Sequence, residues 1–441
     1  MNVEILKKIA IVLIGIALFR IGSHVPVPGV DPYALELMFN NYKGTVLEMF
    51  NTFSGGSLKR LSIFAIGIMP YITASIIMYV AGFFVPFIKE LKESGAAGQI
   101  KVNKITRFFT LFIAFIQAMT LTSTIMRESV NGLPIVPVAD FSFQFLAVVS
   151  LMGGTMSVVW ICDKITEFGL GSGTSIIIYT SIISGIPQAL TGTVELSNTE
   201  QLSNLTLFAI GLIILASILF VTFIEKGQKR LKIINSKSKN QSLHKVNDYL
   251  PFKINMAGVM PSVLASSIIV IPLTITQMFA LSDLEILRTL NKFLEHGSIG
   301  YFIIFGFLIF LLAFFFNNLQ NNPKNIAKKL SDNAVFVEGL RPGLPTEKYL
   351  TKIMNRITII GSTYLLLICL LPEFLVLYWG VPFYFGGTSL LILVAVALEW
   401  QNQISSQMKN VHYDKIENKI DRVFKWNTYM KLIINMKKNM F

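Results

Sequence analysis

The stretch that decides the fold occurs twice, once as Gly67-Ile68-Met69-Pro70-Tyr71-Ile72-Thr73-Ala74-Ser75 and again as Gly258-Val259-Met260-Pro261-Ser262-Val263-Leu264-Ala265-Ser266. The Gly, Met, Pro, Ala and Ser recur at the same offsets, and a β-branched apolar residue recurs at two more. Proline removes a backbone donor and bends or starts a helix. Within a membrane, such a break is tolerated only beside protein or water. The repeat therefore predicts two related helices that break beside one shared central cavity.

The composition places these stretches in a membrane protein. Of 441 residues, 53% are hydrophobic and only 14% are charged, and the mean hydropathy is +0.61. Soluble chains carry nearer a quarter charged residues, and one transmembrane helix needs about 20 mostly apolar residues. We therefore expect an all-α integral membrane protein with ten transmembrane helices. The ten apolar segments are Ile5–Val25, Leu61–Val85, Phe108–Ile125, Phe143–Cys162, Thr174–Leu190, Leu205–Ile224, Met256–Leu281, Ile299–Phe316, Ile357–Leu377 and Pro382–Glu399.

The basic residues predict the orientation. The net charge is +13, and cytosolic loops of membrane proteins keep an excess of Lys and Arg. By contrast, the segment Thr191–Asn204 carries Glu195 and Glu200 and no base. We therefore expect both termini in the cytosol. The basic residues gather in the loops 226–255 and 321–356 and in the tail 403–441.

The N-terminus at first resembles a signal peptide, because Lys7 and Lys8 precede the apolar run Ile9–Ile21. No small-x-small cleavage site follows that run. We expect an uncleaved first span.

The chain is expected to divide into two halves of five spans, residues 1–200 and 201–402, followed by the basic tail 403–441. Because five is odd, the halves run in opposite directions across the membrane. This is an inverted repeat, an architecture common among transport proteins.

Three segments outside the spans allow two interpretations each. The long loops 226–255 and 321–356 are either solvated spacers or a docking platform for an acidic or phosphate-rich partner. The stretch Phe50–Arg60, with Gly55-Gly56, is either an ordinary exposed loop or a small element buried in the outer side of the cavity.

Enzyme chemistry is absent from the sequence. There is no Walker A loop, G-x-S-x-G elbow or H-E-x-x-H motif. Cys162, Cys369 and the four scattered histidines have no metal-ligand spacing, so we expect no metal and no cofactor. No span has a convincing proton relay, which weakens an ion-coupled transporter. Gly169–Gly173 is interpreted as a tight turn that opens a span. The chain is predicted to be a conduit.

Long separated motifs resemble the SecY family of bacterial protein-translocon channels. The resemblance covers nearly the whole chain, from about Phe19 to about Tyr413. The motifs are Phe19–Gly29, Asn51–Ser57, Ile63–Ile77, Asn255–Pro261, Gly339–Gly343 and Val381–Ile392.

The resemblance implies a clamshell of two five-helix halves around an hourglass pore, through which unfolded secretory proteins pass. It also implies a lateral gate between spans two and three on one side and seven and eight on the other, through which membrane segments leave. An apolar ring at the waist would be Ile68, Ile72, Thr174, Ile178, Val263 and Ile392, where Thr174 departs from the usual aliphatic residue. A plug, about residues 45–60, would include Asn51, Phe53, Ser54, Gly55 and Gly56. The gate would be loosened by Ser75, Ser262, Ser266 and Gln277.

The resemblance also implies partners in the cytoplasmic membrane. These are the SecE and SecG subunits, the SecA motor ATPase, the ribosome, signal peptides and nascent chains, and the tail could lie on anionic phospholipid. The docking residues would be Arg341, Lys226, Lys229 and Arg230. Glu338 stands where a proline or small residue is more familiar.

Two alternatives remain open at this point. One is a secondary transporter with an inverted-repeat fold. The other is an accessory SecY paralogue that serves a few dedicated substrates, although the full set of motifs favours the housekeeping form.

Overall fold

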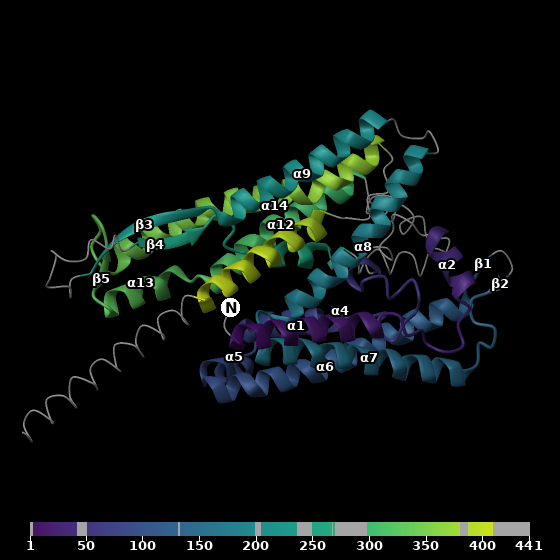
Figure 1. Ribbon diagram of the computed structural model, residues 1–441. Coiled ribbons are helices and arrows are strands. Elements are labelled where there is room, and N and C mark those ends of the chain that lie inside the picture. The colour runs from purple at the N-terminus through teal and green to yellow at the C-terminus, as the bar shows by residue number, and fades with distance from the viewer. Residues whose placement is uncertain are drawn as a thin grey trace, which may run out of the picture.

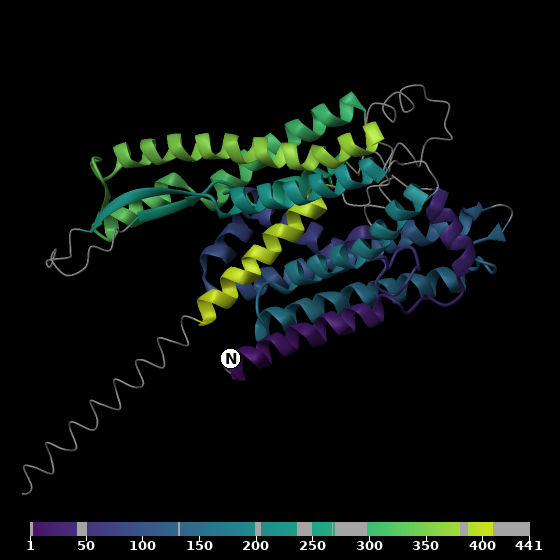
Figure 2. The same cartoon turned by 45° about the horizontal axis from the view of Figure 1, so that its top comes forward.

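Two groups of long helices make up the molecule, and they follow each other along the chain. The computed structural model describes residues 3–41, 51–130, 133–198, 204–235, 249–266, 268–269, 298–379 and 387–408. Figure 1 shows α1, α4, α6 and α7 side by side in one group and α9, α12 and α14 side by side in the other, and the turned view in Figure 2 agrees. We call the group that ends at residue 198 the first half and the group that begins at residue 204 the second half.

The elements of the first half are coloured purple, blue and teal in Figure 1. Within this half, α4 packs against α6, α6 packs against α7, and α1 packs against α7 and α8. Its elements are α1 (Val3–Gly22), α2 (Pro32–Asn41), α4 (Met69–Phe84), α5 (Pro86–Glu93), α6 (Ala96–Arg127), β1 (Ser129–Val130), β2 (Leu133–Pro134), α7 (Phe141–Phe168) and α8 (Gly173–Asn198).

The second half contains α9 (Asn204–Lys226), a short helix over residues 260–266, α12 (Ile299–Gln320), α14 (Leu344–Trp379) and a helix over residues 387–408. Its core includes Val221, Ala265, Ile309, Leu365 and Leu391, one from each of these five helices. The last helix also packs toward the first half, because Trp400 and Ile404 contact the core formed by α1, α7 and α8.

The two expected long loops carry regular structure. Within the loop 226–255, β3 (Gln228–Asn235) and β4 (Tyr249–Lys253) pair as an antiparallel hairpin, and β5 (Val335–Val337) pairs with the far end of β3. Together with α13 (Pro323–Asp332), this three-stranded sheet packs on α14 through Leu231, Phe252, Ala327 and Leu350. We call β3, β4 and β5 the basic sheet. It projects from one end of the second half in Figure 1.

The helix boundaries follow from local chemistry. Pro70 lies in the first turn of α4, and Pro86 begins α5 at a bend of 99°. The Ser298 hydroxyl caps α12 by accepting a hydrogen bond from the Tyr301 amide at 3.1 Å. Asn322 caps α13 in the same way through the Lys324 amide. Among these helices, α4 contributes residues to the candidate site.

Several spans are longer or start later than the sequence indicated. The helix expected at Phe108 already begins at Ala96, and the one expected at Ile357 begins at Leu344, inside the expected loop 321–356. The span expected from Leu61 becomes helical only at Met69. Polar residues lengthen α6 and α14 beyond their apolar stretches, which hydropathy alone does not reveal.

The described residues contain five helices that are long and apolar enough to cross a membrane, and the bent pair Met69–Gly82 and Pro86–Lys92 would make a sixth. Parts of the expected spans Met256–Leu281 and Pro382–Glu399 lie outside the described residues. These long apolar helices agree with the expected all-α integral membrane fold.

Candidate functional site

Four of the six residues expected in a ring meet in one apolar cluster where the two halves join. Ile72 comes from α4, Ile178 from α8, Val263 from the helix 260–266 and Ile392 from the helix 387–408. Phe53, from the segment expected to be a plug, is buried in the same cluster. We call this group the constriction cluster. Its full membership is Phe53, Met69, Ile72, Ile178, Ile182, Val259, Val263, Ile392, Leu393 and Val396.

The other two expected ring residues lie beside this cluster. Ile68 is fully buried in an adjoining core, against which Ile72 and Ile178 also pack. Thr174 stands one helical turn before Ile178, and its hydroxyl lies 2.9 Å from the hydroxyl of Ser172. The Thr174 side chain therefore satisfies its polar atom locally.

Sequence reasoning missed part of the constriction cluster. Val259 is the repeat partner of Ile68, so the repeat itself carried the signal for it. Ile182 lies one turn after Ile178 on α8, and helical spacing could have found it. Val396 lies one turn after Ile392, so the same spacing could have found it, whereas nothing in the sequence pointed to Leu393.

The described part of the plug segment, residues 51–60, is largely buried and held by its own hydrogen bonds. The Asn51 carboxamide oxygen accepts from the Lys59 amide at 2.9 Å, and the Gly56 amide donates to the Asn51 carbonyl at 2.8 Å. Phe53 and Ser54 are only 3% and 2% exposed. This geometry fits the buried element and not the exposed loop. Residues 45–50 of the expected plug lie outside the described residues.

Contacts with other residues of the first half hold the plug segment in place. The Arg20 guanidinium donates to the Gly55 carbonyl at 3.3 Å. Gly55 has a φ of +70° and packs against Ser181 and Ser184 of α8, where a Cβ would come within 3.2 Å of both residues. Glycine is therefore required at position 55 both by its backbone and by its neighbours.

The two ring helices, α4 and the helix 260–266, begin in the same way. Gly67 and Gly258 have φ values of +61° and +68°. In each repeat the carbonyl that follows this glycine, on Ile68 or Val259, accepts two amide hydrogen bonds from the first turn. The sequence repeat thus corresponds to a repeated backbone geometry.

The same correspondence extends to the segment before each glycine. Gly154 of α7 lies directly against the Ile63 carbonyl oxygen, and Gly361 of α14 lies against the Ile254 carbonyl oxygen. Ile63 and Ile254 occupy equivalent positions four residues before Gly67 and Gly258. In both halves the helix at the fourth expected span, α7 or α14, therefore uses a glycine to approach the segment that leads into the ring helix.

The expected gate serines are satisfied within their own helices. The hydroxyls of Ser75, Ser262 and Ser266 each donate to the carbonyl three residues earlier at 2.8 Å. Between the two halves, the Tyr79 ring of α4 stacks on the Phe316 ring of α12, with the ring centres 5.8 Å apart. Sequence reasoning missed this contact. Gln277 lies outside the described residues.

The four cations expected to dock a partner are exposed on the basic sheet and beside it. Lys226, Lys229 and Arg230 are exposed, and the Arg230 guanidinium lies 4.6 Å from the Tyr249 ring centre. Arg341 is exposed in a turn, and its own backbone carbonyl accepts a hydrogen bond from the Thr346 hydroxyl at 2.7 Å. The Glu338 amide bonds the Lys232 carbonyl at 3.2 Å, which ties that turn to β3. Among the described residues, no acidic, His or Cys cluster could hold a metal ion.

Comparisons with known proteins agree on one family. A family model described as SecY matches residues 62–401. A protein translocase subunit SecY of Haemophilus influenzae is 41% identical over 414 residues, which cover 93% of each chain. A solved protein-conducting channel has a TM-score of 0.67 at 15% identity, covering 92% of this chain and 94% of its own. Sec61 in a canine ribosome–channel complex from the endoplasmic reticulum has a TM-score of 0.63 at 15% identity, with the same coverages. At such identity the two structures show a common fold.

Proposed function

Because the chain belongs to the SecY family of protein translocase subunits, we propose that it forms the pore through which unfolded secretory proteins cross the cytoplasmic membrane. The chain is a multi-pass membrane protein and a translocation channel, not an enzyme. The proposed pore is passive, and a bound partner supplies the driving force.

The observation that carries this proposal is the constriction cluster. Ile72, Ile178, Val263 and Ile392 reach it from four helices that are far apart in the sequence and belong to both halves. A narrow ring of apolar side chains excludes water and ions, because neither can leave its hydration shell there at low cost. An unfolded chain can still push the side chains apart, since they are held only by packing.

Phe53 in the same cluster supports a plug for the closed state. With its side chain buried beside Ile72 and Ile178, the segment 51–60 would block the pore until the two halves separate. The Arg20 bond to the Gly55 carbonyl would be lost on opening.

The seam between α4 and α12 is the proposed lateral exit for membrane segments and signal peptides. Helices in a membrane gain little from the hydrophobic effect when they associate, so a seam closed by a ring contact such as Tyr79–Phe316 can open. We propose that Ser75, Ser262 and Ser266 line this exit. Gln277, which the sequence also assigned to the gate, lies outside the described residues.

The exposed cations of the basic sheet support a partner with an acidic or phosphate-rich surface. We assign this role to the SecA motor and the ribosome, the latter supported by the fold shared with a channel of a ribosome complex. SecE and SecG are the proposed membrane subunits. The termini are placed in the cytosol, where the tail 403–441 can contact anionic phospholipid.

A crosslink tests the pore. Secretory chains that carry a thiol-reactive crosslinking group are stalled in the channel, and a cysteine is placed at Ile72 or Ile178. Both positions should crosslink to the chain, whereas a cysteine at Leu212, an exposed position of α9, should not. If small molecules are taken up and no crosslink forms, the secondary transporter is the correct class.

A charge reversal tests the docking role. Arg341→Glu should reduce export of a preprotein into membrane vesicles, because it places a negative charge against an acidic partner. Lys101→Glu, the same change at an exposed position of α6, is the matched control. Unchanged export by Arg341→Glu would refute the role assigned to Arg341.

A further inference from the structure

A buried polar pair stands at the base of the basic sheet, in the second half. The Asn255 side chain, only 4% exposed, donates to the Glu225 carboxylate with Nδ2 and Oε1 2.7 Å apart. The Tyr364 hydroxyl of α14 lies 3.5 Å from the same oxygen. The shorter of these two contacts, from the Asn255 amide to the carboxylate, is among the stronger hydrogen bonds in proteins.

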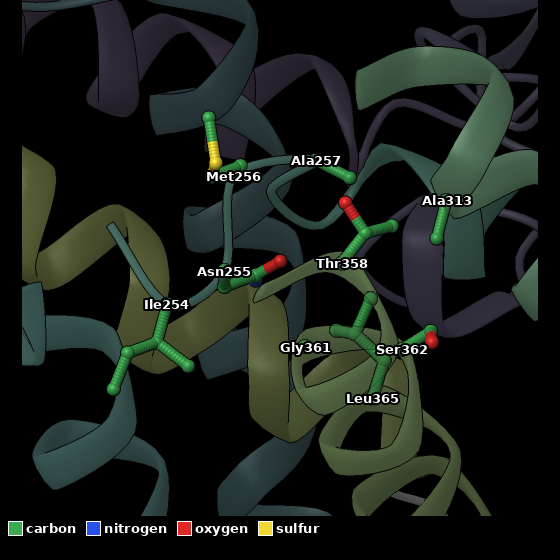
Figure 3. Close-up of a pocket in the computed structure, with 9 residues that line it drawn as sticks. All are labelled: Ile254, Asn255, Met256, Ala257, Ala313, Thr358, Gly361, Ser362 and Leu365. Atoms are coloured by element: carbon green, nitrogen blue, oxygen red, sulfur yellow. The ribbon is translucent and has the colours of Figure 1, made fainter. Parts of the chain in front are cut away.

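The backbone around this pair is held from two further directions. The Ile254 amide donates to the Gly227 carbonyl at 3.0 Å, which joins the two ends of the hairpin. On the other side, Gly361 lets α14 approach the Ile254 carbonyl so closely that a Cβ would lie 2.8 Å from the oxygen. Figure 3 shows Ile254, Asn255, Met256 and Ala257 running past Thr358, Gly361 and Ser362.

The position of the pair is as informative as its geometry. Glu225 comes three residues before β3 begins at Gln228, and Asn255 comes two residues after β4 ends at Lys253. Four residues beyond Asn255, Val259 enters the constriction cluster, followed by Val263. Any displacement of the hairpin therefore reaches the ring helix through the segment that this pair holds.

We propose that Glu225 and Asn255 form a positioning pair, which couples the basic sheet to the ring helix 260–266. The inference rests on the proposed function. A partner that binds the sheet moves the roots of β3 and β4 together, because the Glu225–Asn255 bond joins them. The segment 254–259 then carries this movement to Val259 and Val263. Neither residue contacts the translocating chain.

The chemistry of the pair predicts which substitutions matter. Glu225→Ala leaves the buried Asn255 amide without its acceptor, and Asn255→Ala leaves the carboxylate with only the longer contact from the Tyr364 hydroxyl. Glu225→Gln keeps an oxygen that can accept from Asn255. Because both truncations remove the same bond, the double variant should be no worse than either single one.

The test uses the assembled membrane complex and ribosomes that carry a stalled secretory chain, with a cysteine at Ile72 reporting entry into the pore. In Glu225→Ala and Asn255→Ala, ribosome binding should stay within about twofold, whereas the crosslink should fall about fivefold or more, the range of a typical coupling energy. Glu225→Gln should crosslink like the parent. Glu167→Ala removes an exposed carboxylate at the end of α7 and is the matched control.

The outcomes separate the two proposals. Full crosslinking by both truncation variants overturns the coupling role. Parallel loss of ribosome binding and crosslinking, together with lower thermal stability, assigns the pair a structural role only and also overturns it. Failure of the parent channel to crosslink refutes the proposed function itself. If Glu225→Ala does not assemble, Asn255→Ala decides alone.

Discussion

The segments that lead into the two ring helices, 63–67 and 254–258, share a backbone geometry but differ in their side chains. In the first half, Phe64 stacks on Phe19 of α1 with ring centres 5.9 Å apart. At the equivalent position of the second half, Asn255 bonds Glu225 of α9. Each residue thus contacts the first long helix of its own half. The inverted repeat has conserved the contact and changed its chemistry from apolar to polar.

The elements attached to these entries differ too. The Phe64 entry follows the buried plug segment, whereas the Asn255 entry follows the exposed basic sheet. The hydrophobic burial that holds an aromatic stack is largely non-directional and tolerates small shifts, while a short charge-assisted hydrogen bond fixes both distance and direction. The difference suggests that the first entry only has to hold its segment, whereas the second has to transmit movement.

The largest expected effect comes from the backbone contact that both halves share. Gly154→Val places a side chain into the Ile63 carbonyl, which has no flexible end to move, and should cost about 4 kcal/mol or more. Gly361→Val meets the Ile254 oxygen less closely and should cost about 2 kcal/mol. Thermal unfolding of the purified complex in detergent measures both.

The neighbouring glycine provides the control for this prediction. A Cβ on Gly153 would meet nothing within 4 Å, so Gly153→Ala should be tolerated. Equal stability of Gly153→Ala and Gly154→Val would show that α7 does not hold the ring-helix entry by close approach.

The second effect separates the two chemistries. Phe64→Ala removes a side chain that is 5% exposed and should cost about 3 kcal/mol through lost packing. It should lower stability and translocation together, unlike the Asn255 variants, which should uncouple ribosome binding from translocation. Phe112→Ala, at a 58% exposed position of α6, should have little effect. A Phe64 variant that uncouples binding from translocation would remove the proposed contrast between the halves.

The third effect should be equal in the two halves. Alanine at Gly67 or Gly258 must adopt a left-handed backbone, which costs roughly 1–2 kcal/mol. A Cβ meets nothing at Gly258 and only ordinary contacts at Gly67, so strain dominates in both cases. Gly211→Ala, in the middle of α9 with open space around it, should cause no loss of stability. Clearly unequal losses would show that the two glycines are not equivalent.

The sequence predicted the repeated parts of this site better than the unique parts. The family resemblance assigned Ile72 and Val263 to the ring, and these two residues occupy equivalent positions of the repeat. The repeat could also have indicated Val259, because duplicated geometry leaves similar residues at the same offsets. The Glu225–Asn255 pair could not be predicted, because its members are thirty residues apart and meet only when the hairpin closes. The hairpin itself was hidden by its charge, since Lys and Arg on β3 made the segment look like a solvated loop.

The smallest expected effect concerns the surface ion pairs of the plug segment and of the basic sheet. Lys59, at the end of the plug segment, pairs with Glu36 of α2 at 2.8 Å, whereas Lys232 of the basic sheet lies 3.8 Å from Glu338. The hydrogen bond and charge of Lys59 hold the pKa of Glu36 below its ordinary value. The stabilisation is therefore present above the unfolded pKa of about 4.3 and is lost as the pH falls through the lower folded pKa.

Because the Glu36 side chain is 58% exposed, solvent screens this ion pair and limits its contribution to below about 1 kcal/mol. The stability of the parent and of Glu36→Gln, measured from pH 7 to pH 3, should differ slightly at pH 7 and converge at the acidic end. Added salt should reduce the difference at pH 7. A difference that grows toward low pH would mean that Glu36 is not held as a carboxylate by Lys59. The plug would then depend on its buried contacts alone.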